Sequence, residues 1–124
     1  MALTGWLASL DDAKREQVFA WMRATGEKSL KEMERSRFLL SGGGIPVGAA
    51  GFDHFLTGNT VDEYLSALRN GFDPATALTR AKDMGRICVQ KHNAQRKRDV
   101  CWQRYEASAD TGLEHLHRTL LAIL

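Results

Sequence analysis

The residues best suited to chemistry in this 124-residue chain form a basic stretch toward its C-terminal end. The segment 91–98 carries four cations and two side-chain amides, and two aromatic residues and a further arginine follow it closely. Lysine and arginine neutralise phosphates, amides hydrogen-bond to base edges, and aromatic rings stack or anchor at the backbone. These residue types together predict a nucleic-acid surface, with DNA favoured.

Each residue of this stretch has an expected role. The phosphate contacts are expected from Lys91, Arg96, Lys97, Arg98 and Arg104. Asn93 and Gln95 are the expected base readers, and Trp102 and Tyr105 are expected to position the basic segment.

The charge balance shows how concentrated these cations are. The chain has a net charge of only +2, yet residues 80–104 hold eight Lys or Arg residues against two aspartates. The remainder of the chain is therefore acidic overall. A basic helix face also suits an acidic protein partner, or is simply solvated, and both alternatives stay open here.

A second segment is notable because it has no charge. Residues 38–52 include five glycines, but they lack the lysine and Ser/Thr of a phosphate-binding loop. The segment is predicted to link two helical halves or to contact a partner. In the second case the contacting residues are Ile45, Pro46, Val47, Phe52, His54 and Phe55.

Little in the sequence favours catalysis. Asp53 and His54 are the local pair on which a small enzyme would be built, whereas Asp62 and Glu63 are better explained as charges that stabilise the start of a helix. No known nucleophile motif occurs. We expect that the protein is not an enzyme, with an enzyme that uses Asp53 or His54 as the alternative.

A metal site is not expected either. Cys88 and His92 are four residues apart and share one helix face, which suits half of a metal site. However, no CxxC motif exists, and His115 and His117 point in different directions on a helix. Cys88 is therefore expected in the core, with no metal and no cofactor.

Helix signals recur along the chain, and strand signals are nearly absent. N-terminal caps are predicted at 9–12, 29–32, 60–63 and 73–74, C-terminal stops at Gly26, 41–44 and Gly71, and a turn at 108–112.

The helix that begins at Pro74 is predicted to bury one face. That face spans about 140° and contains Ala77, Leu78, Ala81, Met84, Gly85, Cys88, Val89 and His92. Its small residues would let another helix approach closely. Asp99 would interrupt the face, so a break is predicted there, followed by a short helix through Trp102 and Tyr105.

These signals predict an all-α protein with a single domain over residues 1–124, containing about six helices and a Gly-rich central loop. The expected parts are a helical hairpin over 1–41, the loop and a short helix over 42–58, and a half resembling a helix-turn-helix over 59–124. No apolar run is long enough to cross a membrane. Two cysteines and an N-terminus unlike a signal peptide favour the cytoplasm.

The second half of the chain has a recognisable outline. A helix with Leu65 and Leu68 is followed by a turn at Gly71, an alanine-rich helix with Ala77, Ala81 and Gly85, a basic cluster Arg96–Asp99, and Trp102. This outline, over residues 60–118, resembles the helix-turn-helix region of phage small terminase subunits and related mobile-element proteins. The segment 77–85 is longer than in that family, and residues 1–50 match nothing in it.

The resemblance implies DNA binding through the second and third helices of this region, and ring-like oligomers. We therefore expect a small phage or mobile-element protein that binds nucleic acid in the cytoplasm of a bacterial or phage-infected cell. The alternative is an inhibitor or adaptor whose basic face and Gly-rich loop dock on an acidic protein. Apolar residues in 113–124 are compatible with a homo-oligomer in either case.

Overall fold

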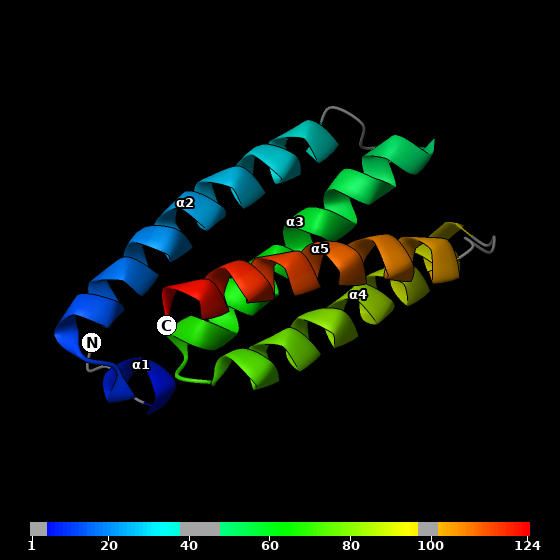
Figure 1. Cartoon of the computed structure of the whole chain (residues 1–124). Coiled ribbons are helices and arrows are strands. Elements are labelled where there is room, and N and C mark those ends of the chain that lie inside the picture. The colour runs from blue at the N-terminus through cyan, green and yellow to red at the C-terminus, as the bar shows by residue number, and fades with distance from the viewer. Residues whose placement is uncertain (1–4, 38–47, 97–101) are drawn as a thin grey trace.

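The computed structural model describes the backbone of residues 5–37, 48–96 and 102–124, and the side chains of 5–31, 56–91 and 109–124. The described residues form five helices and no strand: α1 (Gly5–Ser9), α2 (Asp12–Arg37), α3 (Gly48–Arg69), α4 (Pro74–Arg96) and α5 (Trp102–Ile123) (Figure 1). The all-α prediction is confirmed, with five helices in place of about six. None of these helices is long and apolar enough to cross a membrane.

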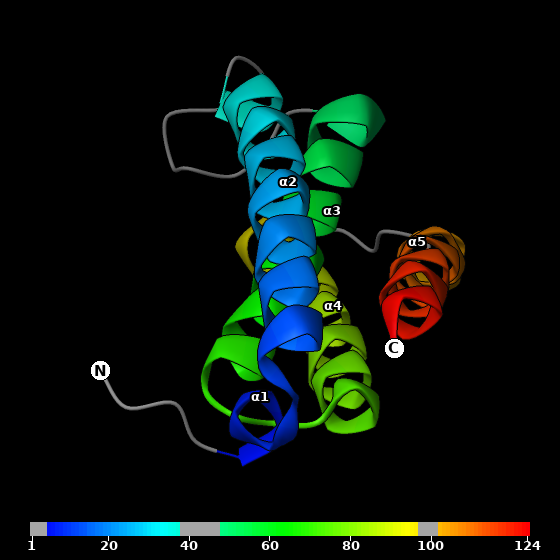
Figure 2. The same cartoon turned by 60° about the vertical axis from the view of Figure 1, so that its left-hand side comes forward.

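Helix α3 is the centre of the arrangement, because it packs against each of the other four helices. Helices α2 and α3 form one hairpin, and α4 runs back along α3 from the turn at residues 70–73. Helix α5 covers α3 and α4 and also touches α2 (Figures 1 and 2).

Helix α2 is longer than the sequence predicts. Asp11 caps its start, accepting a hydrogen bond from the Lys14 backbone N–H at 2.8 Å. The helix then continues through Gly26 and Ser29, so the predicted stop at Gly26 and the hairpin within 1–41 are wrong. The hydroxyl of Ser29 does not cap a helix; it donates to the Gly58 carbonyl of α3 at 3.1 Å.

Helix α3 begins earlier than predicted. The cap expected at Thr60 lies in the middle of the helix, where the Thr60 hydroxyl donates to the Thr57 carbonyl at 3.1 Å. Of the Gly-rich loop and short helix predicted over 42–58, residues 48–58 all belong to α3, and 42–47 lie outside the described residues. A glycine costs a helix only about 1 kcal/mol relative to alanine, which the packing of α3 against α2 offsets.

Helix α5 is continuous as well. The turn predicted at 108–112 and the short helix through Trp102 and Tyr105 are both parts of one helix over Trp102–Ile123. The predicted break near Asp99 falls within 97–101, a segment outside the described part of the chain.

The connection between α3 and α4 follows the sequence prediction closely. Gly71 has a φ of 93°, and its N–H donates to the Leu68 carbonyl while the Phe72 N–H donates to the Ala67 carbonyl. This pair of bonds is the Schellman motif that ends many helices. Asp73 then caps α4, because its carboxylate accepts the Thr76 backbone N–H at 3.4 Å. The Thr76 hydroxyl also donates to this carboxylate at 2.6 Å, which lowers the pKa of Asp73.

Helix α1 is fastened to this same turn. The Trp6 N–H donates to the Gly71 carbonyl at 2.9 Å, and Gly5 has a φ of 62°. A Cβ atom on Gly5 would lie 2.1 Å from the Gly71 oxygen, so only glycine fits there. The Arg15 guanidinium closes the other end of α1 by donating to the carbonyls of Leu7 and Ala8.

The predicted buried face of α4 is confirmed where side chains are described. Ala77, Ala81, Gly85, Cys88 and Val89 are buried, and Leu78 and Met84 are half-buried. A Cβ on Gly85 would lie only 3.3 Å from the Thr60 methyl, which shows how closely α3 and α4 approach.

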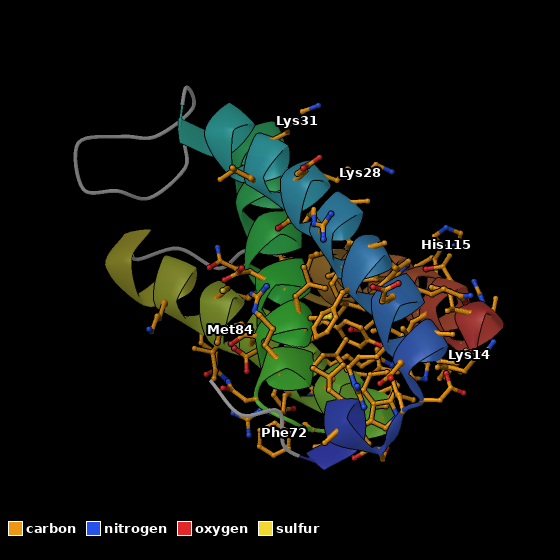
Figure 3. All side chains as sticks on the ribbon, turned by 90° about the vertical axis from the view of Figure 1, so that its left-hand side faces the viewer. Lys14, Lys28, Lys31, Phe72, Met84 and His115 are labelled. Atoms are coloured by element: carbon orange, nitrogen blue, oxygen red, sulfur yellow. The ribbon has the colours of Figure 1, made fainter. Side chains whose placement is uncertain are left out.

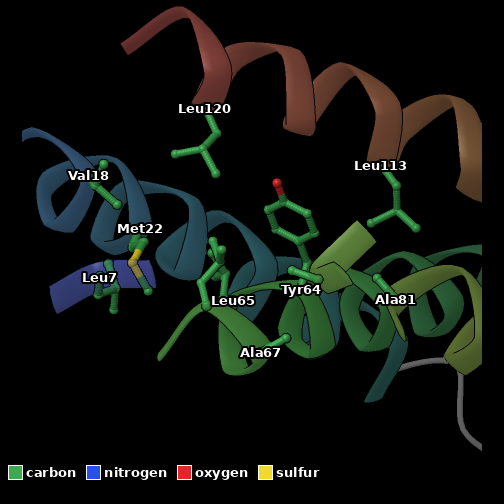
Figure 4. Close-up of a cluster of buried hydrophobic side chains, with 11 residues drawn as sticks. Leu7, Val18, Met22, Tyr64, Leu65, Ala67, Ala81, Leu113 and Leu120 are labelled. Carbon is green, nitrogen blue, oxygen red and sulfur yellow. The ribbon is translucent and has the colours of Figure 1, made fainter. Parts of the chain in front are cut away.

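The core joins α3 to α2 and α5 (Figure 4). The Tyr64 ring points from α3 toward α5 among buried leucines, and its hydroxyl lies 2.9 Å from Nδ1 of His117. Trp21 of α2 donates from Nε1 to the Thr119 hydroxyl at 3.1 Å. Helix α5 is therefore held by paired polar groups as well as by apolar contacts.

Replacing Gly71 with alanine should destabilise the protein, because a Cβ in the left-handed region costs about 1–2 kcal/mol. Gly71→Asn should lose less stability than Gly71→Ala, since asparagine tolerates this backbone conformation. Urea denaturation of wild type and both variants measures their free energies of unfolding. Equal stability of wild type and Gly71→Ala would contradict the prediction.

Replacing Tyr64 with phenylalanine should lower the free energy of unfolding by about 1 kcal/mol, since it leaves His117 without its partner at the core. A double-mutant cycle with His117→Ala isolates the bond. Additive losses in that cycle would mean that the two groups do not stabilise one another.

Candidate functional site

The first half of the basic stretch is neutralised by carboxylates. On α4, Arg80 pairs with Glu63 of α3 at 3.5 Å, Lys82 with Glu114 of α5 at 2.9 Å, and Arg86 with Asp83 at 2.5 Å. The hydrogen bond from Lys82 lowers the pKa of Glu114. These three cations serve the protein itself, so they offer little charge to a ligand.

Lys91 differs from the cations that precede it on α4. Its side chain is exposed, and within the described residues it forms no ion pair with a carboxylate. It begins the cluster of cations that the sequence singles out, at the end of α4 far from α1 (Figure 1).

The other predicted contact residues are located by their backbone alone. Asn93, Gln95 and Arg96 lie on the last turn of α4, and Trp102, Arg104 and Tyr105 lie on the first turn of α5. The described side chains do not include theirs, and Lys97 and Arg98 fall in 97–101, outside the described chain. We call residues 91–96 and 102–105 together the basic end.

Part of the predicted partner loop lies in a helix. Phe52, His54 and Phe55 lie in the first two turns of α3, as does Asp53, the other residue of the enzyme hypothesis. Their side chains are not among those described, and Ile45, Pro46 and Val47 precede the described part of α3.

Cys88 lies in a small apolar cluster with Leu56 and Val89, and burial raises the pKa of its thiol. A neutral thiol is a poor nucleophile and a poor metal ligand. Among the described residues, no three His, Cys, Asp or Glu side chains lie together as a metal site would require.

A cavity that the sequence did not predict lies between α2, α3 and α5, with a volume of about 260 Å³. Its described lining residues are Thr25, Lys28 and Ser29 of α2, Thr57, Thr60 and Val61 of α3, and Ala109, Gly112, Leu113, His115 and Leu116 of α5. The sequence pattern predicts helix caps at Ser29 and Thr60 and a turn at Gly112, and none of these patterns indicates a cavity.

Gly112 is the unusual member of this lining. It lies in the interior of α5, and a Cβ atom added to it would meet no other atom within 4 Å. Close packing therefore does not require a glycine here, although glycine weakens a helix.

Gly112→Ala should therefore raise the free energy of unfolding by about 0.5–1 kcal/mol, because alanine favours the helix and meets no neighbour. Chemical denaturation measures the gain. A loss of stability would show that the glycine has a packing role after all.

The chain was compared with protein-family models, curated proteins and solved structures, and no significant match was found in any of the three.

Proposed function

We propose that this protein binds nucleic acid, with DNA favoured, through the basic end and without catalysing a reaction. The observation that carries the proposal is the division of cations along α4. Arg80, Lys82 and Arg86 are paired with carboxylates, whereas Lys91 is exposed and unpaired among the described residues.

The sequence also shows that few acidic residues accompany the cations that follow Arg86. Residues 91–105 contain five Lys or Arg residues against a single aspartate, Asp99. Unpaired cations at one end of a molecule attract phosphates and release their counterions, which is the main source of sequence-independent affinity for DNA. Asn93 and Gln95 are the candidates for reading bases within that surface.

The hairpin of α4 and α5 gives the basic end a firm support. The Lys82–Glu114 ion pair links the two helices, and Ala109 packs against the cluster of Leu56, Cys88 and Val89. A preorganised surface loses less conformational entropy on binding than a disordered basic tail does.

As the sequence predicts, we propose that the protein belongs to a phage or mobile element and acts in the cytoplasm of a bacterial or phage-infected cell. The proposal also includes self-association through the end of α5, where Leu121 of the helix and Leu124 directly after it are 47% and 44% exposed. Exposed apolar side chains on one helix are common at subunit interfaces.

An acidic protein partner is the second candidate, and Ile87 favours it. This apolar side chain is 43% exposed on α4, one helical turn before Lys91. Aliphatic side chains beside cations suit a protein surface better than a phosphate backbone. Ile87→Ser would weaken such a complex and leave DNA binding unchanged.

The experiment measures binding to a fluorescent random-sequence DNA duplex at salt concentrations from about 50 to 200 mM. The variant Lys91→Glu/Arg96→Glu should bind more weakly to all sequences, and its log–log salt slope should be shallower by about 2.

The matched control is Arg23→Glu/Arg118→Glu, which changes the net charge equally at two exposed positions on α2 and α5. It should retain most of the affinity. No binding by wild type at low salt, or equal losses in both variants, would overturn the proposal.

A further inference from the structure

We propose that the cavity between α2, α3 and α5 binds a small carboxylate with an apolar body. This inference does not depend on nucleic-acid binding, since none of the lining residues belongs to the basic end. It rests on the volume of the cavity, the charge of its lining and the hydroxyl groups near that charge.

The volume suits a small organic molecule. A cavity of about 150 Å³ can hold benzene, so the 260 Å³ available here corresponds to about ten non-hydrogen atoms. Val61, Leu113 and Leu116 supply apolar surface from α3 and α5. Ala109 adds a small side chain, so the body of the ligand is expected to be a ring or a short branched chain.

The charge of the lining indicates an anionic group at one end of the ligand. Lys28 is the one fully charged side chain among the described lining residues, and no carboxylate is among them. Lys28 and His115 are both exposed and lie toward the same side of the molecule in Figure 3. An anionic group at this rim would meet a cation without facing a competing acid.

Hydroxyl groups add hydrogen-bond donors near the same cation. Thr25 lies one helical turn before Lys28 on α2, and Thr57 lines the cavity from α3. Within the described residues the hydroxyls of Thr25 and Thr57 form no hydrogen bond, whereas those of Ser29 and Thr60 donate to backbone carbonyls. A carboxylate accepts such donors well.

Gly112 is the lining residue at which a larger side chain disturbs the fold least. It is exposed, and a Cβ added to it would meet no other atom within 4 Å. A side chain can therefore be introduced at this point of the lining without displacing a neighbour.

The probes are 3-phenylpropionate and its neutral amide, which share one shape and differ in charge. Binding to the whole protein is measured by calorimetry and by NMR shifts of the Thr25 and Gly112 amides. We expect the carboxylate to bind with a Kd between about 10 μM and 1 mM, and more tightly than the amide.

Two variants test the two parts of the site. Gly112→Leu adds a large side chain to the lining of the cavity and should weaken binding of both probes by about tenfold or more while α5 stays folded by circular dichroism. Lys28→Gln should weaken only the carboxylate, by about two- to fivefold. Gly112→Ala and Lys31→Gln are the matched controls and should bind as wild type does.

Three outcomes would overturn the inference. The first is the absence of saturable binding of either probe up to about 10 mM. The second is unchanged affinity in Gly112→Leu, which would locate binding elsewhere. The third is equal affinity of wild type for the carboxylate and the amide, which would show that the site does not select an anionic head group.

Discussion

The enclosure of α3 by four other helices is the constraint on which the rest of the structure depends. Tyr64, Leu65, Ala67 and Leu68 are all buried within one helical turn and a half, so this segment has almost no solvent face. Each face of a helix enclosed in this way must be complementary in shape to the helix that packs against it. Gly85 meets Thr60 from α4, Ser29 reaches Gly58 from α2, and the Tyr64 hydroxyl meets α5.

That enclosure also explains the distribution of charge. Helix α4 packs against both α3 and α5, and each of these neighbours places a carboxylate, Glu63 and Glu114, against its first cations. Beyond Arg86, the described neighbours offer α4 no such partner, and Lys91 extends into solvent. Among its described residues, α4 thus carries three cations that pair with carboxylates and one, Lys91, that is exposed, a division that a count of charges does not reveal.

The sequence predicted best those features that depend on near neighbours. The Gly71 turn, the Asp73 cap and the buried face of α4 follow from residues within two helical turns of each other. It failed at Ser29 and Thr60, because a hydroxyl that caps a helix and one that bonds inside or between helices look alike in sequence. The cavity draws on three segments far apart in the chain, and no local pattern brings them together. The sequence shows where the basic residues are, but it does not show which of them pair with carboxylates of other helices.

The contact between Gly5 and Gly71 has a consequence for evolution. These two residues are 66 positions apart, yet the backbone of one fills the space that a side chain on the other would need. In a set of homologues, position 71 would therefore stay glycine because it closes α3, whereas position 5 would be restricted to glycine only where the N-terminal helix packs against that turn. Position 5 would mark, in sequence alone, which relatives keep α1 docked.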